Sequence, residues 1–531
     1  MSISKKYIPL FIGTALAIGI LIGSKLRFTS NPSNSSSNNR KKDKLNKLID
    51  YIDFEYVDQV NTDSIVDVAV NKILSNLDPH SVYISQQDLK SSRENMKGNF
   101  VGIGVSFYTY KDSIAVIRPI KDGPSYNAGI KSGDRILLAN KDTLYGKKTK
   151  NTDIIKKLKG PLNSKVNLLV YRKSNDSLLN FTLKRSKIPI ASVDANYMLT
   201  NKLGYIKINR FAESTYKEFK TSLSKLQKLG ATEIALDLRD NPGGFLHIAE
   251  QILDEFLEDQ TLLLFTKNKH GTIQKSYATS TGDFENKKVY VLINEKSASA
   301  SEIVAGALQD NDKGTIIGRR SYGKGLVQRE MSLGDGSVVR LTISRYYTPT
   351  GRSIQRDYKK GNKDYFDEYF SRLNSGELLD SMKIQVSDSL KFTTPNGKIV
   401  YGGGGIIPDI FVPINTTNNY VDTLNYLHQS GFIRYFIFEN LEKNRFVYQN
   451  ISRQDFIDNY QVKDKLVNQF QEYLNKHTTS KIELSKYKAN VKTYIKATLA
   501  NQLYDPSALE EILNKNDLMI NKLITISNNT N

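Results

Sequence analysis

The 531-residue chain has no cysteine. Disulfide bonds, thiolate zinc sites, iron–sulfur clusters and a cysteine nucleophile are therefore excluded, although the compartment is not fixed, because a secreted protein can also lack cysteine. Histidine is scarce as well, with five residues. The sequence has no His-Glu-x-x-His motif and no acid–histidine cluster with metal-ligand spacing, so neither a metalloprotease nor any metal or cofactor is predicted.

A concentrated run of charge of one sign is also missing. Lys and Arg total 75 against 55 for Asp and Glu, which gives a formal charge of +20. The excess is spread along the chain, as is typical of solvated faces, so no nucleic-acid partner is predicted. With 39% hydrophobic and 24% charged residues, the chain can bury real cores, and its length suggests three or four domains at about 150 residues each.

One long uncharged stretch lies near the N-terminus. Lys5 and Lys6 precede residues 7–24, which carry no charged side chain. As a helix this stretch would reach about 27 Å, close to the thickness of a bilayer's hydrocarbon core. An uncleaved membrane anchor is favoured over a cleaved signal peptide, which would have a shorter apolar region and a small-x-small site. Both interpretations predict that the rest of the chain lies outside the cytoplasm, in the cell envelope on the periplasmic side of the inner membrane.

Changes of pattern along the chain indicate an α/β multidomain protein. Helical spacing, for example at Leu45, Leu48, Ile49 and Ile52, gives way to short strands and turns, then to alternating strands and helices, then to a Lys-rich helical tail. The predicted regions are an N-terminal membrane anchor or signal (1–25), a linker (26–40), a helical N-terminal region (41–97), a β-rich domain (98–186), an α/β core (187–414) and a helical C-terminal region (415–531).

The α/β core has the clearest alternation. Buried strands are predicted over 204–209, 233–238, 262–265, 288–293 and 314–317, with helices over 215–229, 246–258 and 301–310. Residues 326–330 and 337–347 alternate in the manner of a β-hairpin. Helices are predicted over 463–477 and 484–503 in the tail.

A glycine-rich loop opens the β-rich domain at Gly102, Ile103, Gly104 and Val105. Successive backbone N–H groups at the start of a strand can bind a carboxylate, and the strand edge can accept an added peptide strand. An isolated Gly-x-Gly is more often only a tight turn. Residues 123–137, however, closely resemble the matching stretch of PDZ domains, which bind the free C-terminus of another polypeptide.

A candidate nucleophile lies between the strand at 288–293 and the helix that follows. The sequence there is Ser-Ala-Ser-Ala-Ser-Glu over residues 297–302. Small residues allow a sharp turn that exposes a hydroxyl, and a helix N-terminus supplies free N–H groups for an oxyanion. The alternative is that these serines only cap the helix.

A candidate base is Lys324, which lies between two glycines and four residues before Gln328. If the strand begins by Lys324, its period of two places both side chains on one face. Burial would lower the pKa of this lysine from about 10.4 towards neutrality and make it a usable base, and Gln328 could orient the amine. The alternative is a solvated charge. Residues 318–324 match part of a phosphate-binding P-loop, but Gly325 stands where Ser or Thr should ligate Mg²⁺, so nucleotide binding is not predicted.

Residues 237–244, Asp-Leu-Arg-Asp-Asn-Pro-Gly-Gly, follow a predicted buried strand and precede a helix. Paired glycines at Gly243 and Gly244 would leave backbone N–H groups open to a ligand, which makes this loop an oxyanion-hole candidate. An ordinary strand-to-helix loop is the alternative.

Together, and in this order, the segments 237–244, 297–310 and 322–328 resemble the carboxy-terminal processing peptidases, also called tail-specific proteases. Residues 76–81 and 347–352 and the glycines of 402–405 fit the same family. The resemblance covers about residues 45–412 and implies a crotonase/ClpP-like β-α spiral core with an inserted PDZ domain. It further implies that Ser299 is the nucleophile, that Lys324 is the general base assisted by Gln328, and that the oxyanion is held by the N–H groups of Ala300 and of Gly243 or Gly244.

The implied activity is a serine endopeptidase of the Ser-Lys type, acting through an acyl-enzyme. Its substrates would be cell-envelope proteins with free, apolar C-termini that the PDZ domain captures, and the helical tail could form a homo-oligomer. Two alternatives remain open at this point. His247, close to the glycine pair, could form a triad with Ser299 and an Asp, or the chain could be a non-enzymatic PDZ scaffold or an apolar-ligand binder on the same fold.

Overall fold

The computed structural model describes residues 13–14, 39–110, 112–146, 150–415, 426–427, 429–478 and 482–529. The predicted membrane anchor at 7–24 therefore lies outside the described residues, apart from Gly13 and Thr14. In the described ranges, no helix combines the length and the apolar character needed to span a bilayer. The chain forms two compact units, residues 1–76 and residues 77–531.

The first unit contains two helices, α2 (Asn39–Glu55) and α3 (Thr62–Leu74). Asn61 caps α3, because its side-chain oxygen accepts the N–H of Ser64 at 2.9 Å. The sequence predicts that the turn at Asp78 ends this helix, whereas the helix ends at Leu74.

The second unit is built on a six-stranded sheet. The strand order is β10 (Val193–Met198), β11 (Leu203–Ile208), β12 (Glu233–Asp237), β15 (Lys288–Ile293), β16 (Gly314–Gly318) and β21 (Ile410–Phe411). All neighbours are parallel except β10 and β11. Continuous apolar runs suit strands that are covered on both faces, which confirms the predicted core strands at 204–209, 233–238, 288–293 and 314–317.

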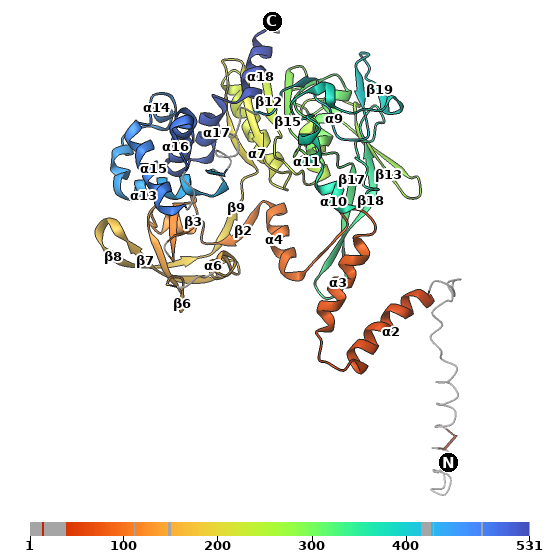
Figure 1. Cartoon of the computed structure of the whole chain (residues 1–531), viewed down its shortest axis with the longest axis horizontal. Helices are drawn as coiled ribbons and strands as arrows, with labels where there is room; N and C mark the ends of the chain where they lie inside the picture. Colours follow the sequence, from red (N-terminus) through yellow and green to blue (C-terminus); the bar gives the residue numbers. More distant parts are fainter. Residues whose placement is uncertain are drawn as a thin grey trace, which may run out of the picture. The chain divides into compact units, whose positions relative to one another are not determined.

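Helices cover both faces of this sheet (Figure 1). On one face α7 (Thr215–Lys228), α8 (Leu246–Asp254) and α9 (Ala300–Asp310) pack on Leu236 and Val291. On the other face α18 (Leu518–Asn529) packs Met519, Ile520 and Leu523 against alternate residues of the same strands. Helix α8 ends at Asp254 and not at 258 as predicted.

A second, antiparallel sheet carries the predicted hairpin. It contains β1 (Val82–Ile84), β13 (Leu262–Asn268), β14 (Ile273–Tyr277), β17 (Leu326–Ser332) and β18 (Val338–Tyr347). Strands β17 and β18 pair antiparallel with a bulge between Val327 and Gln328. The strand predicted at 262–265 thus belongs to this sheet and not to the parallel one, because β13 pairs with β18 and β14.

The β-rich domain is a separate six-stranded sheet with its own core. Its strands are β3 (Val105–Tyr110), β4 (Ser113–Pro119), β5 (Arg135–Ala139), β6 (Asp142–Thr143), β7 (Lys165–Arg172) and β8 (Ser177–Lys184), and its helices are α5 (Pro124–Asn127) and α6 (Asn151–Leu158). The chain enters and leaves through a two-stranded ribbon of β2 (Asn99–Gly102) and β9 (Ser186–Pro189).

The C-terminal region is helical. It comprises α13 (Phe432–Asn444), α14 (Arg453–Asp458), α15 (Asp464–His477), α16 (Lys488–Leu503), α17 (Pro506–Asn514) and α18, so the helices predicted at 463–477 and 484–503 are confirmed. The first five share one apolar core. Smaller elements precede this region: α4 (Gln86–Lys97), α10 (Asn362–Phe366), α11 (Glu368–Asn374), β19 (Lys391–Thr393) and β20 (Ile399–Tyr401).

The C-terminal helices contact the β-rich domain on one side (Figure 1). Phe438 of α13 packs on Tyr108 and Tyr110 of β3. Arg135 forms an ion pair with Glu442, and its guanidinium lies 4.8 Å from the Tyr110 ring centre and 5.1 Å from that of Phe438. The contact therefore combines packed aromatic rings with a largely buried ion pair.

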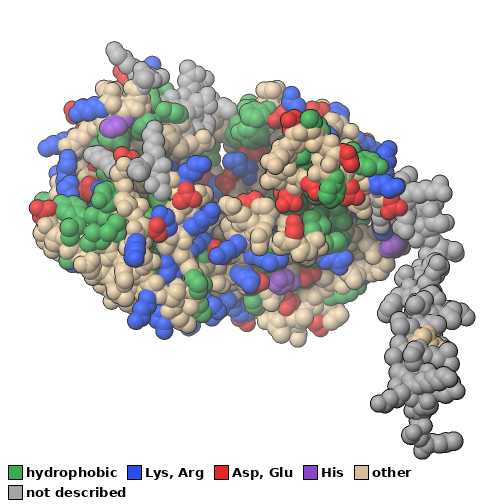
Figure 2. Space-filling view, turned by 90° about the horizontal axis from the view of Figure 1, so that it is seen from below, with side chains coloured by type: hydrophobic (Ala, Val, Ile, Leu, Met, Phe, Trp, Pro, Cys, Tyr) green, Lys and Arg blue, Asp and Glu red, His purple; other side chains and the backbone are tan. Residues whose placement is uncertain are grey.

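The same helices contact the parallel sheet on their other side. Lys207 pairs with Glu510 at 2.9 Å, and Arg239 pairs with Asp517 at 2.7 Å. The C-terminal region thus joins the β-rich domain to the core. On the surface visible in Figure 2, Lys and Arg side chains are scattered among Asp and Glu, in agreement with the dispersed charge of the sequence.

Candidate active site

The three serines of residues 297–301 have different surroundings. Ser297 Oγ donates to the Leu238 carbonyl at 2.8 Å, Ser301 Oγ donates to the Asn241 carbonyl at 3.0 Å, and both side chains are buried. Ser299 is only partly buried and stands at the N-cap of α9. Its φ of 55° and ψ of −113° fall in a region that favours glycine, so the backbone is strained at this serine. The outer serines fix the loop, and the middle one is presented at the helix start.

Gly243 lies directly against Ser299. A Cβ at Gly243 would be 2.8 Å from Ser299 Cβ and 2.9 Å from the Ala300 nitrogen, so only glycine fits. The Gly243 N–H donates to Asn241 Oδ1 at 2.8 Å. In contrast, the N–H groups of Gly244 and Ala300 have no hydrogen-bond acceptor among the described residues. The structure therefore brings the predicted oxyanion residues beside the predicted nucleophile, with one of the N–H groups already engaged.

Glu302, in the first turn of α9, connects the two catalytic candidates. It is fully buried, and its Oε2 accepts the N–H of Ser299 and the N–H of Lys324, both at 2.9 Å. Its Oε1 accepts Ser321 Oγ at 2.5 Å and the N–H of Gly323 at 2.6 Å. Burial raises the pKa of this carboxyl, although the four hydrogen bonds oppose the rise.

A tyrosine on β18 makes a second connection. The Tyr346 hydroxyl lies 2.8 Å from the Lys324 carbonyl and 3.2 Å from the Ser299 carbonyl. Burial raises the pKa of this hydroxyl well above 10, so it stays protonated and can donate. Neither Glu302 nor Tyr346 is among the residues predicted from the sequence. The spacing Ser299-x-x-Glu302 is a capping-box signature and could have identified the first.

Lys324 and Gln328 are brought together, although β17 begins only at Leu326 and has a bulge between Val327 and Gln328, so the contact does not follow from the period of two. Lys324 Nζ donates to Gln328 Oε1 at 3.0 Å, and Gln328 Nε2 donates to the His80 carbonyl. The pKa of Lys324 is lowered to about 8, mainly by burial and further by the charge of Arg340, while the carboxylates of Glu302 and Asp78 oppose the shift. A substantial fraction of this amine is therefore neutral near pH 8.

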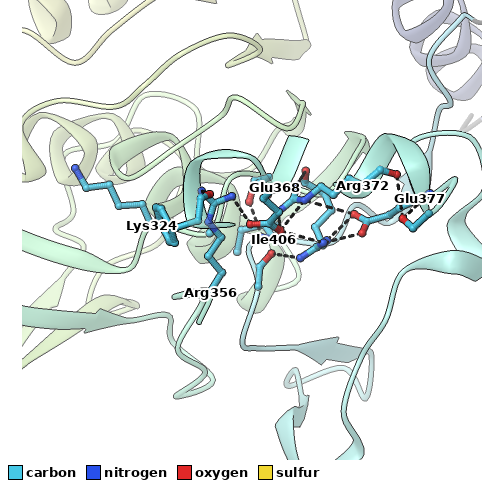
Figure 3. Close-up of polar contacts among 12 residues, drawn as sticks. Lys324, Arg356, Glu368, Arg372, Glu377 and Ile406 are labelled. Carbon is cyan, nitrogen blue, oxygen red and sulfur yellow. Dashed lines mark hydrogen bonds and ion pairs between the residues drawn. The ribbon is translucent and has the colours of Figure 1, made fainter. Parts of the chain in front are cut away.

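The segment 320–324 is held by a buried network of charges and rings (Figure 3). Arg372 Nη1 donates to the Ser321 carbonyl at 2.8 Å, and Arg320 is paired with Glu377 at 2.7 Å. Arg356 lies over the ring of Tyr322, at 3.9 Å from its centre. In Figure 3 the Lys324 side chain points away from this cluster, so the network supports the backbone and leaves the amine free of it.

The histidine alternative receives no support from the geometry. The His247 ring lies against Phe245, with ring centres 5.3 Å apart. Over the described ranges, no hydrogen bond joins His247 to Ser299 or to a carboxylate. The same ranges contain no group of three His, Asp or Glu side chains that could hold a metal ion.

The glycine-rich loop of the β-rich domain leads into an edge strand. Gly104 has φ +74°, and the loop of Ile103 and Gly104 separates β2 from β3. The Ile103 carbonyl accepts Ser125 Oγ at 2.7 Å, which fixes the loop. Val105 of β3, which pairs on one side only, packs in one cluster with Ile154 and Leu158 of α6.

Comparison with known proteins finds family matches in three parts of the chain. The model of peptidase family S41 matches residues 202–361, that of the PDZ domain matches 101–183, and that of a family of unknown function matches 423–505. The carboxy-terminal processing protease CtpB of Bacillus subtilis is 33% identical over 332 residues, which cover 61% of this chain and 67% of that protein. A carboxy-terminal-processing protease of Bartonella bacilliformis is 32% identical over 356 residues, which cover 66% and 80%.

Among solved structures, a photosystem II D1 C-terminal processing protease is 24% identical with a TM-score of 0.37, covering 71% of this chain and 88% of that one. The two curated relatives share a large part of their length with this chain at more than 30% identity. The chain therefore belongs to the carboxy-terminal processing proteases of peptidase family S41 and is a serine-type peptidase with a PDZ domain.

Proposed function

We propose that this protein is an endopeptidase that processes the C-terminal tails of other proteins, with Ser299 as nucleophile and Lys324 as general base. The observation that carries the proposal is that one buried oxygen of Glu302 accepts the N–H groups of both residues at 2.9 Å. The two segments therefore lie side by side at the start of α9, where the helix N-terminus favours negative charge.

Each proton is accounted for in the proposed reaction. Ser299 Oγ attacks the carbonyl carbon of the scissile peptide bond and gives its proton to neutral Lys324 Nζ. The tetrahedral oxyanion accepts the Ala300 N–H and one glycine N–H, either that of Gly244 or that of Gly243 after release from Asn241. The leaving amine takes the proton from Lys324, and the peptide C–N bond breaks to leave a serine ester. Water then attacks the ester and gives a proton to Lys324, whose amine Gln328 orients. The bond between the acyl carbon and Ser299 Oγ breaks, Oγ takes the proton back from Lys324, and the product leaves with a free carboxyl group.

The PDZ domain would select the substrate. A free carboxylate would bind the loop formed by Gly102, Ile103, Gly104 and Val105, and the substrate chain would add to the edge of β3 beside α6. Apolar C-termini are the expected ligands, because Val105 belongs to an apolar cluster at this edge. The printed names of the relatives, which describe carboxy-terminal processing, support the same substrate class.

We place the enzyme on the extracytoplasmic side of the inner membrane, tethered by residues 7–24, with cell-envelope proteins as substrates. The uncharged stretch after Lys5 and Lys6 supports this assignment. Alkaline extraction of membranes tests it: retention in the membrane pellet is expected, and release of the full-length chain would contradict the tether.

The parallel sheet with its helices also supports a crotonase/ClpP-like core. A homo-oligomer in solution is proposed as well, and a monomeric mass would contradict it.

The reaction is tested on an unfolded protein that ends in apolar residues. Wild type is expected to produce fragments and to be labelled by a serine-directed phosphonate, and Ser299→Ala is expected to do neither. Ser389→Ala, at an exposed position, is the matched control. Lys324→Ala should also lose cleavage, whereas Lys228→Ala, on the exposed end of α7, should not. Equal fragment patterns from wild type and Ser299→Ala would refute the proposal.

A further inference from the structure

The turn of residues 78–81 is closed by its own hydrogen bonds, and its His80 carbonyl contacts Gln328, the partner of the base. Asp78 Oδ1 accepts the N–H groups of His80 and Ser81, each at 2.9 Å, and Oδ2 accepts Ser81 Oγ at 2.6 Å. Asp78 and Ser81 are both buried. A carboxylate that accepts two backbone donors and one hydroxyl fixes the direction of the peptide groups that carry the His80 and Ser81 N–H.

The turn is attached to β18 at the residue that faces Gln328. Thr342 Oγ1 donates to Asp78 at 3.1 Å, and the Thr342 N–H donates to Ser81 Oγ at 3.2 Å. Thr342 is the cross-strand partner of Gln328 in the β17–β18 pair. The His80 carbonyl is thereby held where it accepts the amide N–H of Gln328.

This contact decides which end of the Gln328 amide faces the lysine. A carbonyl can only accept, so the NH₂ end of the amide must face His80. The oxygen end then faces Lys324 Nζ, 3.0 Å away, and can only accept from it. A neutral amine has two N–H groups and one lone pair. Since an N–H points at Gln328, the lone pair remains available for the proton of a serine hydroxyl.

The His80 ring belongs to the aromatic cluster that precedes Lys324. Its Nε2 lies 2.7 Å from the Tyr365 hydroxyl, and its centre lies 5.2 Å from that of Tyr365 and 6.3 Å from that of Tyr322. Arg356 lies over both tyrosine rings. His80 therefore belongs to this cluster through its ring, and through its carbonyl and Gln328 it is two hydrogen bonds away from the Lys324 amine.

The ring is uncharged at neutral pH. The pKa of His80 is lowered to about 4, mainly by burial and further by the charges of Lys324 and Arg356, with Asp78 opposing. An imidazole with this pKa is a poor proton acceptor for Ser299, but as an uncharged ring it is suited to exclude water.

We propose that His80 is a positioning residue of the base: its carbonyl fixes the Gln328 amide, and its neutral ring keeps water away from the Lys324 amine. The inference rests on the proposed Ser299–Lys324 mechanism. The charged groups that act on Lys324 are Arg340 from β18, Glu302 from α9 and Asp78 from the turn. A change confined to the His80 side chain leaves all three groups in place. Its effect on the pKa of Lys324 therefore measures only the exclusion of water by the ring.

The test is the pH dependence of kcat/KM. In wild type the acidic limb should follow the Lys324 pKa of about 8. His80→Ala admits water and should move that limb up by about one pH unit, so that activity falls about tenfold at pH 7 and less than about threefold at pH 10. His80→Phe keeps the bulk and should leave the limb within about 0.3 unit of wild type. Val82→Ala, two residues along at the edge strand, is the matched control and should not move it.

Each outcome decides the proposal. If His80→Ala folds and keeps the wild-type acidic limb, the exclusion of water by the ring is refuted. If the melting curve shows that the alanine variant does not fold, His80→Val is measured instead. A His80→Phe limb that moves as far as that of His80→Ala also refutes it and would indicate imidazole chemistry. Full activity in Lys324→Ala refutes the proposed mechanism itself. An inactive Lys324→Ala together with an unmoved His80→Ala limb refutes only the role of His80.

Discussion

The backbone N–H groups of Ser299 and Lys324 donate to the same oxygen of Glu302, each at 2.9 Å. The nucleophile and base segments are 25 positions apart in the sequence, and one buried side chain holds them together. The carboxylate has no salt-bridge partner within the described part of the chain, and four hydrogen bonds stabilise it there.

Replacement of Glu302 by Gln is therefore expected to cost both stability and activity. One end of an amide cannot accept, so either the Ser299 and Lys324 N–H groups or the Ser321 and Gly323 donors would face an NH₂ group. We expect a loss of about 2–3 kcal/mol in the free energy of unfolding by urea, and a fall in kcat/KM of more than tenfold under conditions where the variant is folded. Glu472→Gln, at an exposed position on α15, should change neither. Wild-type stability in Glu302→Gln would contradict this role.

Lys324 should make the folded protein less stable near neutral pH. Its pKa is about 8 when folded and about 10.4 when unfolded, so the unfolded chain binds more protons between these values. Stability from this group should therefore rise as pH increases from 8 to 10.4. Lys324→Met should abolish cleavage and raise the free energy of unfolding at pH 7 by about 1–3 kcal/mol. The gain should shrink towards pH 10.4, as urea titrations at several pH values would measure, and Lys228→Met should show no such trend.

Gly243→Ala separates close packing from backbone strain. The new Cβ would lie 2.7 Å from the Ala298 carbonyl oxygen and 2.8 Å from Ser299 Cβ, at a φ of +97°. Gly271 has a similar φ of +81° and nothing within 4 Å of a Cβ, so Gly271→Ala carries only the strain. We expect about 1 kcal/mol lost and full activity for Gly271→Ala, but at least a hundredfold loss of kcat/KM for Gly243→Ala. Equal effects at both sites would show that packing against Ser299 is unimportant.

The contact between the PDZ domain and the C-terminal helices should depend on one ion pair. Arg135 and Glu442 expose 12% and 9% of their side chains. Arg135→Glu and Glu442→Arg should each lower the free energy of unfolding in urea by about 2–4 kcal/mol, because each places two charges of the same sign side by side in a buried position. The double reversal should recover at least about 1 kcal/mol of the summed loss. The more exposed pair Lys157–Asp142 should give a coupling below about 1 kcal/mol in the same cycle. Additive losses for the first pair would contradict the interface.

The sequence was sufficient for most of the elements. Small residues before a helix predict that Ser299 is presented at the helix start. The Lys324–Gln328 contact was expected from a strand that begins by Lys324, whereas β17 begins at Leu326 and has a bulge before Gln328, so the observed contact does not follow from the period of two. The hairpin at 326–347 and the parallel strands were predicted from alternation and from apolar runs, and the family assignment from its motifs is confirmed.

Contacts between distant segments were not predictable in this way. Periodicity shows that 262–265 is a strand, but pairing with β18 is what assigns it to the second sheet. His80 and Gln328 are 248 positions apart, and nothing local to either reveals their hydrogen bond. In the sequence, Glu302 looks like any acidic residue in the first turn of a helix. Its partners Ser321 and Gly323 belong to another segment of the chain, so its hydrogen bonds to them could not be predicted.

Helix α18 follows the rest of the helical C-terminal region in the sequence, and yet it covers one face of the sheet whose other face carries α9. Ser527 Oγ donates to Glu233 at 2.6 Å, and Lys202 donates to the Ser527 carbonyl at 2.8 Å, so the starts of β11 and β12 are also tied to this helix. Without α18, apolar side chains such as Tyr290 and Leu292 would lose their cover on this face. The sheet that carries the nucleophile is thus completed by a helix that lies outside the contiguous protease sequence.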